Sequence, residues 1–315
     1  MSGAHEAFHA AVLAALGYAP DVIEPGRMHR FATSARRGDD AGWCKLFPDL
    51  RGGVFGCYRA GISETWQAER HQPMTCEQRT ALARQVAEAT AERNRQQRQQ
   101  WTDNRGRIAR LWAQCVPLVP GDPVMQYLRH RGLSSLRPVP LCLRLHRALP
   151  CWEREQRLGT FPAMVAPLSA PDGQVVALHR TYLAPDGSKA AVPSPKKLTP
   201  TAGPLDGACI RLHAPRAGVI GIAEGIETAL AAFLASGVPT VAAYSAGNLA
   251  AWRWPSGVRR LVVFGDNDPA GRRAAEELRA RALATGLPCQ VIAPSEDGAD
   301  WCDVWAAHTL AEVAA

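Results

Sequence analysis

The last third of the chain alternates between short apolar runs and amphipathic segments. The runs at 219–223, 261–264 and 289–293 have the length of buried strands, and residues 226–237 and 269–286 follow a helical period. Strands that alternate with helices predict βαβ units around a parallel sheet. We therefore expect an α/β domain here, with a small parallel sheet flanked by helices.

The first third of the chain has a different pattern. Residues 5–17 predict a short amphipathic helix that ends at Gly17, and residues 25–67 predict a small antiparallel unit with Gly and Asp turns. Residues 76–115 predict one long helix. Its middle is rich in Arg and Gln, which favours a solvated connector; the alternative is a basic helix that contacts a nucleic-acid backbone.

The segment between these regions mixes both kinds of element. Residues 121–133 predict a short helix, and two strands within 161–190 are joined by a Pro-Asp-Gly turn. The chain is α+β overall. We expect four parts: a small β-rich module (1–75), a helical connector (76–119), a mixed α/β subdomain (120–204) and the α/β domain (205–315).

Charge and cysteine content narrow the class of protein. The net charge of +7 favours a polyanionic partner such as nucleic acid. Nine scattered cysteines include no CxxC pair, which indicates reduced thiols and argues against a zinc ribbon in the N-terminal module. No apolar run is long enough to span a bilayer, so we expect a soluble, cytoplasmic protein without membrane contact.

Acidic residues follow three of the predicted strands. Glu224 ends the first, Asp266 and Asp268 follow the second, and Asp300 and Asp303 follow the last. A helix N-cap explains Asp268 alone, but not acids at all three ends. Because the carboxyl ends of parallel strands share one edge, these side chains predict a site for Mg²⁺, or Mn²⁺. Glu224 is then a general base or a further ligand.

These acidic segments carry a family resemblance. The stretches AEGIETAL, FGDNDPAGRRAA and DWCDVW resemble, in order and spacing, the three acidic motifs of the Toprim domain. That domain is shared by DnaG-type primases, type IA and II topoisomerases, OLD-family nucleases and recombination mediators. The resemblance covers about 205–315 and is strongest to phage and plasmid primase-like proteins. It implies catalytic roles for Glu224, Asp266 and Asp268.

The flank before this domain is similar to the DnaG-type catalytic core. YLRHRGL resembles the element that opens that core, and PAMVAPLSAPDGQVVALHRTYL resembles a later core segment. Several Lys and Arg side chains lie in or near these segments. One interpretation is that they are exposed at a sheet edge, where their charge prevents pairing with other strands. The resemblance instead implies contacts with nucleotide or template for Arg129, Arg131, Arg180, Lys189, Lys196 and Lys197.

The resemblance implies a DNA primase of a phage, plasmid or integrated element. Such an enzyme makes short RNA primers from nucleoside triphosphates on single-stranded DNA, and a replicative helicase is a possible partner. The alternatives are a metal-dependent Toprim nuclease and a non-catalytic DNA-binding replication accessory protein. The N-terminal module sits where primases carry a zinc-binding domain, although its zinc ligands are absent. The sequence DWCDV also departs from the D-x-D-E form of the cellular motif, which leaves the role of Asp303 open.

Overall fold

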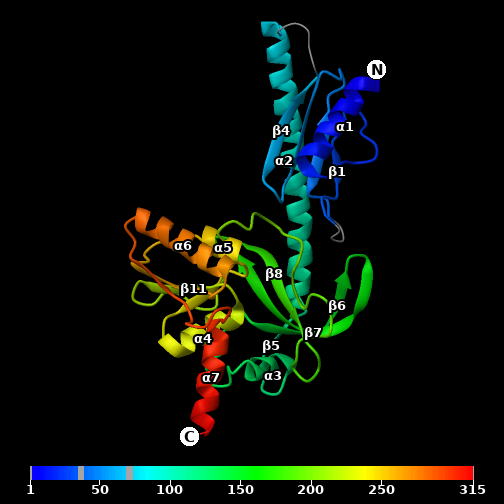
Figure 1. Cartoon of the computed structure of the whole chain (residues 1–315). Coiled ribbons are helices and arrows are strands. Elements are labelled where there is room, and N and C mark those ends of the chain that lie inside the picture. Colours follow the sequence, from blue (N-terminus) through cyan, green and yellow to red (C-terminus); the bar gives the residue numbers. More distant parts are fainter. Residues whose placement is uncertain (1, 35–38, 69–73, 315) are drawn as a thin grey trace. The chain divides into compact units, whose positions relative to one another are not determined.

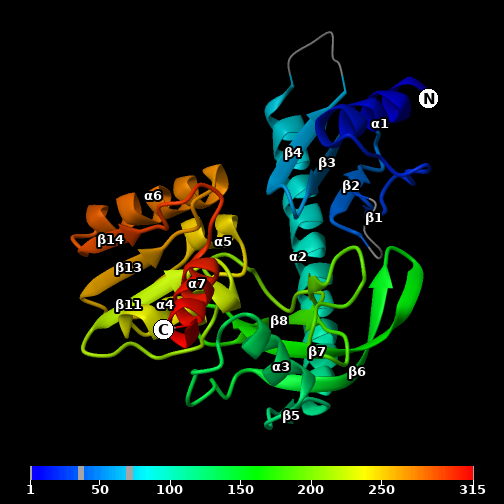
Figure 2. The same cartoon turned by 60° about the horizontal axis from the view of Figure 1, so that its bottom comes forward.

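The chain folds into two compact units in a computed structural model that describes residues 2–34, 39–68 and 74–314 (Figures 1 and 2). The first unit comprises 1–100 with 152–157, and the second comprises 101–151 with 158–315. Helix α2 (Cys76–Ala113) contributes residues to both. The four-part division of the sequence stays a prediction.

The first unit is a small antiparallel sheet between two helices. Its strands pair in chain order, and α1 ends where Gly17 takes a φ of +72°. The bounds are α1 (Ser2–Leu16), β1 (His29–Phe31), β2 (Gly42–Leu46), β3 (Gly52–Cys57) and β4 (Ile62–Gln67). These elements confirm the predicted helix and antiparallel strands.

Alternate side chains of this sheet pack on opposite faces. Cys44 and Phe55 pack with Phe8 of α1, whereas Trp43 and Val54 pack with the part of α2 around Ala89. The aromatic side chains therefore build two small cores, one on each face of the sheet.

The second unit is built on one large mixed sheet. Among the described residues it has ten strands in the order β14-β13-β11-β12-β10-β7-β6-β5, with β8 on β7 and β9 on β8. Its bounds in the first half are β5 (Val116–Pro117), α3 (Pro123–His130), β6 (Arg144–Glu153), β7 (Gln156–Ser169), β8 (Val175–Tyr182), β9 (Lys196–Leu198) and β10 (Cys209–Ile210). These strands pair antiparallel, and β10 joins them to the rest of the sheet.

The second half of this sheet is parallel. Strands β11, β12, β13 and β14 run in the same direction, as the apolar runs predict. The bounds are β11 (Val219–Ala223), α4 (Ile226–Ser236), β12 (Thr240–Ala242), α5 (Ala246–Ala251), β13 (Arg260–Phe264), α6 (Pro269–Ala284), β14 (Cys289–Ile292) and α7 (Trp301–Ala314).

Helices cover both faces of the parallel strands, as Figure 2 shows. On β13, Val262 and Phe264 pack into the core that includes α4 and α7, whereas Leu261 and Val263 pack with α5 and α6. A strand buried on both faces explains its unbroken apolar run. The prediction of an α/β domain with helices on a parallel sheet is thus confirmed.

Within 2–34, 39–68 and 74–314, no helix combines the length and the apolar composition that crossing a bilayer requires.

Candidate active site

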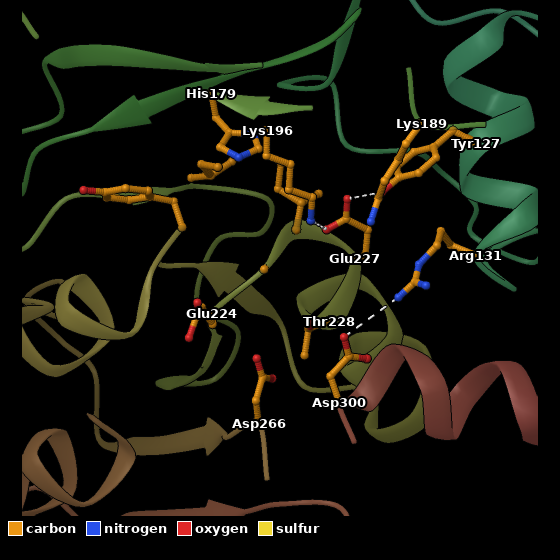
Figure 3. A pocket seen from close by; sticks show the side chains of 14 residues that line it. Tyr127, Arg131, His179, Lys189, Lys196, Glu224, Glu227, Thr228, Asp266 and Asp300 are labelled. Atoms are coloured by element: carbon orange, nitrogen blue, oxygen red, sulfur yellow. Dashed lines mark hydrogen bonds and ion pairs between the residues drawn. The ribbon is translucent and has the colours of Figure 1, made fainter. Parts of the chain in front are cut away.

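Two carboxylates follow neighbouring parallel strands at one edge of the sheet. Ala223 of β11 is in register with Phe264 of β13, so Glu224 and Asp266 leave the sheet beside each other. The N–H of Tyr244 donates to the Glu224 carbonyl at 2.8 Å and fixes the turn after β11. Figure 3 shows both side chains pointing into the same pocket.

The surroundings of this pair disfavour negative charge. Burial raises the pKa of Asp266 to about 7, and the charges of Glu224, Asp300 and Asp268 act in the same direction. Burial and Asp268 also raise the pKa of Glu224. The Oδ1 atom of Asp266 is buried and has no hydrogen-bond partner among the described residues. A cation between the two carboxylates would relieve both costs.

The DNDPAG segment explains why Asp266 and Asp268 differ in their surroundings. The side chain of Asp268 is the N-cap of α6 and accepts the N–H of Gly271 at 2.7 Å. Asp268 is exposed and does not line the pocket. A Cβ atom at Gly271 would lie 2.6 Å from the carbonyl oxygen of Asp266. Glycine therefore lets the first turn of α6 pack against the backbone that carries Asp266.

The last two of the predicted acids, Asp300 and Asp303, lie at the start of α7. Asp300 lines the pocket, whereas Asp303 is exposed and does not. The carboxylate of Asp300 accepts the N–H of Asp303 at 2.9 Å. Both carboxylates lie near the guanidinium of Arg131, at 3.8 and 3.7 Å. Of the five predicted acids, the structure thus brings three into one pocket and leaves Asp268 and Asp303 at its margin.

Cations from the preceding region line the same pocket. Its volume is about 220 Å³, and Arg131, Lys189 and Lys196 line it together with the acids (Figure 3). Arg131 caps the C-terminal end of α3, and Lys196 begins β9. Three of the six predicted basic residues therefore reach the pocket.

The register of β8 and β9 keeps two of the others away from it. Lys196 pairs with Thr181 and Lys197 with Arg180, so the two lysines lie on opposite faces. Arg180 donates to the Leu198 carbonyl at 2.5 Å and to the Tyr182 hydroxyl at 3.2 Å. Neither Arg180 nor Lys197 lines the pocket.

Arg129, the last of the six predicted cations, does not line the pocket either. It lies exposed on α3, two positions from Arg131. Because α3 turns by 100° per residue, side chains two apart point in different directions.

A buried glutamate outside the predicted set of site residues binds a lysine of the pocket. Glu227 is 3% exposed and accepts from Tyr127 Oη at 2.5 Å and from Lys196 Nζ at 2.8 Å. Burial alone would raise the pKa of Glu227, but the charge and hydrogen bond of Lys196 and the bond from Tyr127 lower it to about 2. An acid in the first turn of a helix is common because of the helix dipole, so the sequence carried no separate signal for this role.

A buried histidine also lines the pocket. Burial lowers the pKa of His179 to about 4; the charge of Glu227 opposes this shift, and the charges of Lys196 and Arg180 add to it. The imidazole is therefore neutral at physiological pH and does not add to the positive charge of the pocket. Its place on β8, opposite Leu198 of β9, follows from the same register that separates Lys196 from Lys197.

The acids of the pocket fit a magnesium ion that takes some of its ligands from water and substrate, rather than a metal ion bound by protein side chains alone. No three His, Cys, Asp or Glu side chains in the described parts of the chain lie close enough to hold an ion among themselves. Mg²⁺ is commonly held by one or two carboxylates, with water and substrate phosphates as the other ligands. Glu224 and Asp266, with Asp300 nearby, match that pattern.

Two family models match the second unit. Residues 219–310 match the Toprim domain, which confirms that part of the resemblance. Residues 102–212 match a domain of unknown function, DUF7146. The chain thus carries a Toprim domain, and the pocket lies where that domain and the preceding matched region meet in one sheet. A comparison with curated proteins found no match.

Three solved structures that are similar to the chain are described as primases or parts of primases. The RNA polymerase domain of Mycobacterium tuberculosis primase DnaG is 21% identical over 53% of this chain and 59% of that one, with a TM-score of 0.32. The primase fragment of the bacteriophage T7 primase-helicase protein is 17% identical over 54% and 66%, with a TM-score of 0.36. The zinc-binding and RNA polymerase domains of the Aquifex aeolicus primase are 13% identical over 100% and 84%, with a TM-score of 0.39. The chain spans little more than half the length of the first of these.

Proposed function

We propose that the chain is a primase-like nucleotidyltransferase that makes short RNA primers on single-stranded DNA. One observation carries this proposal: carboxylates at the ends of Toprim strands and cations of the preceding region line a single pocket. A nucleoside triphosphate needs both, because its phosphates bind cations directly and bind carboxylates through a divalent metal ion. The motif order and the YLRHRGL flank favour a primase over other Toprim enzymes.

The acidic side of the pocket would hold the metal ion. Glu224 and Asp266 are its proposed ligands, and Asp300 is placed to help. When bound, Mg²⁺ or Mn²⁺ would neutralise charge on the phosphates and act as a Lewis acid at the phosphate oxygens, which makes the attacked phosphorus more electrophilic. Asp268 would add negative charge near the ion, and its hydrogen bond as the N-cap of α6 fixes the turn that follows Asp266.

The reaction joins two nucleotides. The 3′-hydroxyl oxygen of one attacks the α-phosphorus of the other, a new O–P bond forms, and the bond from the α-phosphorus to the bridging oxygen breaks to release pyrophosphate. The hydroxyl proton needs an acceptor, and the raised pKa of Glu224 suits it to that role. If Glu224 binds the metal instead, a water molecule takes the proton.

The basic side of the pocket would orient the triphosphate. Lys189, Lys196 and Arg131 supply ammonium and guanidinium donors, which bind phosphate oxygens by charge-assisted hydrogen bonds. The net charge of +7 fits a DNA template bound along its backbone. We further propose that Arg129, Arg180 and Lys197 bind the template outside the pocket. The proposal also includes a helicase partner, a cytoplasmic location and an origin in a phage, plasmid or integrated element.

A primer-synthesis assay tests the proposal. Purified chain is incubated with single-stranded DNA, Mg²⁺ or Mn²⁺ and labelled nucleoside triphosphates, beside Asp266→Ala/Asp268→Ala. The matched control is Asp297→Ala, because Asp297 is an exposed carboxylate between β14 and α7 that lies outside the pocket. We expect short products from the parent and the control and none from the double variant.

Other outcomes would favour the alternative functions. Degraded template without synthesis would indicate a metal-dependent nuclease that uses the same acids. DNA binding without either reaction, with or without a helicase present, would indicate an accessory protein that keeps the Toprim fold. Synthesis that persists in the double variant would contradict the assignment of the site.

A further inference from the structure

The ion pair between Glu227 and Lys196 joins a buried charge to a half-exposed one. The side chain of Glu227 is 4% exposed, whereas that of Lys196 is 40% exposed. Leaving a buried carboxylate without its cation is costly, so Lys196 stays on Glu227. An ammonium group has three N–H donors, and Glu227 takes one. The others can donate to a ligand in the pocket that Lys196 lines.

Glu227 is itself held in place from a second direction. Tyr127 is 2% exposed and donates its hydroxyl to the carboxylate oxygen that Lys196 does not use. The chain just after the helix that carries Tyr127 is anchored to α7, where Trp305 Nε1 donates to the Gly132 carbonyl at 3.0 Å. The carboxylate therefore has one orientation, fixed by α3 on one side and by β9 on the other.

Lys196 lies between two groups of acids. On one side it binds Glu227 directly. On the other side it faces the pocket that the proposed metal ligands Glu224 and Asp266 also line (Figure 3). Because a lysine side chain is long and flexible, some contact must select this position among its rotamers. The bond to Glu227 is the direct ion pair that does so (Figure 3).

We infer that Glu227 is a positioning residue, which orients the Lys196 ammonium toward the phosphates of a nucleoside triphosphate and offsets part of its charge. This inference rests on the proposed function. Glu227 acts only through Lys196 and does not contact the reacting atoms. Its loss should therefore leave phosphate binding intact or tighter, because the full lysine charge is released, while the bound triphosphate is less well oriented.

A double-mutant cycle tests this role. Glu227→Gln keeps the side-chain shape and an oxygen acceptor for Tyr127 but removes the charge. We would measure it beside Lys196→Met, the combination of both, and Glu277→Gln, which makes the same chemical change on the exposed face of α6. The readouts are ATP binding by calorimetry in the presence of Ca²⁺, and kcat and KM for primer synthesis.

We expect Glu227→Gln to bind ATP as tightly as the parent or up to about threefold more tightly. Its kcat should fall by about tenfold or more. Both effects should vanish when Lys196 is already Met. Equal effects of Glu227→Gln in the two backgrounds would overturn the inference, as would a loss of ATP binding with unchanged kcat. The control Glu277→Gln should match the parent.

Folding and function are separated by further measurements. If Glu227→Gln does not fold, Glu227→Asp keeps the charge and shortens the reach, and the same fall in kcat without loss of ATP binding is expected. A parent that binds ATP but makes no primer would overturn the proposed function. ATP binding would then decide the role of Glu227: parental or tighter binding in Glu227→Gln with weaker binding in Lys196→Met supports it, and a similar loss of binding in both variants overturns it. A parent that binds no ATP would overturn both.

Discussion

Replacing Asp266 by Asn should make the metal-free protein more stable at alkaline pH. Asp266 is buried beside other acids, and its Oδ1 atom has no partner among the described residues. Its pKa of about 7 lies far above the value of 3.8 for an ordinary aspartate. Between about pH 4 and pH 7 the folded protein keeps this proton and the unfolded chain loses it. Stability therefore falls as the pH rises through this window, and the full cost applies above pH 7.

The size of the effect follows from the pKa. A shift of about three units corresponds to about 4 kcal/mol. The side chain is not fully buried, so solvent screening reduces this to about 2 kcal/mol. The Asn amide also lacks partners there, which offsets a further fraction. We expect a net gain of about 1.5 kcal/mol at pH 8, or roughly 3 to 6 °C in melting temperature for a domain of this size.

Thermal denaturation with a chelator present measures this gain. Parent and Asp266→Asn are compared at about pH 4.5 and about pH 8, and the gain should appear mainly at the higher pH. Asp297→Asn is the matched control, because its carboxylate is 88% exposed and ion-paired with Arg272. An Asn variant that is no more stable than the parent at pH 8, or equally more stable at both pH values, would refute the argument.

Three further predictions concern the same pocket. In thermal denaturation, Mg²⁺ at a hundredfold excess over its Kd should stabilise the parent by about 2 to 3 kcal/mol, and it should not stabilise Asp266→Ala/Asp268→Ala. Equal stabilisation of both proteins would show that the ion binds elsewhere. Gly271→Ala should destabilise the fold by about 1 kcal/mol or more in denaturant unfolding, because the new Cβ would lie 2.6 Å from the Asp266 carbonyl oxygen. A neutral or stabilising effect would contradict the close packing of α6 against the backbone of Asp266. Lys196→Met should lower the free energy of unfolding by about 2 kcal/mol in the same measurement, because it leaves the Glu227 carboxylate buried without its cation. Adding Glu227→Gln should restore part of this stability. A double variant that is no more stable than Lys196→Met alone would contradict this prediction.

Much of the fold could be predicted because local signals agree with the tertiary structure. The run of residues 261–264 is apolar throughout, since β13 is covered on both faces, and Pro269 with Asp268 marks the start of α6. The placing of Glu224 and Asp266 at one edge followed from the direction of parallel strands alone. Strand β10 is too short, with two residues, to give a periodic signal, although it joins the two halves of the sheet.

The basic side of the pocket was harder to predict. Which of two adjacent lysines faces the pocket depends on the pairing of β9 with β8, and sequence alone does not give that register. Tyr127 and Glu227 are a hundred residues apart, so their bond could not be read from local spacing. An acid in the first turn of a helix has an ordinary explanation in the helix dipole, which hides the buried role of Glu227.

The central claim is that the two sides of the pocket serve one nucleotidyl transfer. The most direct test is the rate at which the first phosphodiester bond forms, measured across Mg²⁺ concentrations. The proteins compared are the parent, Asp266→Asn, Lys196→Met and the control Asp297→Asn, each below its melting temperature. We predict that the acidic and the basic variant each lose about a hundredfold or more in this rate, while the control keeps the rate of the parent. A parental rate in either the Asp266 or the Lys196 variant would contradict a single site built from both sides.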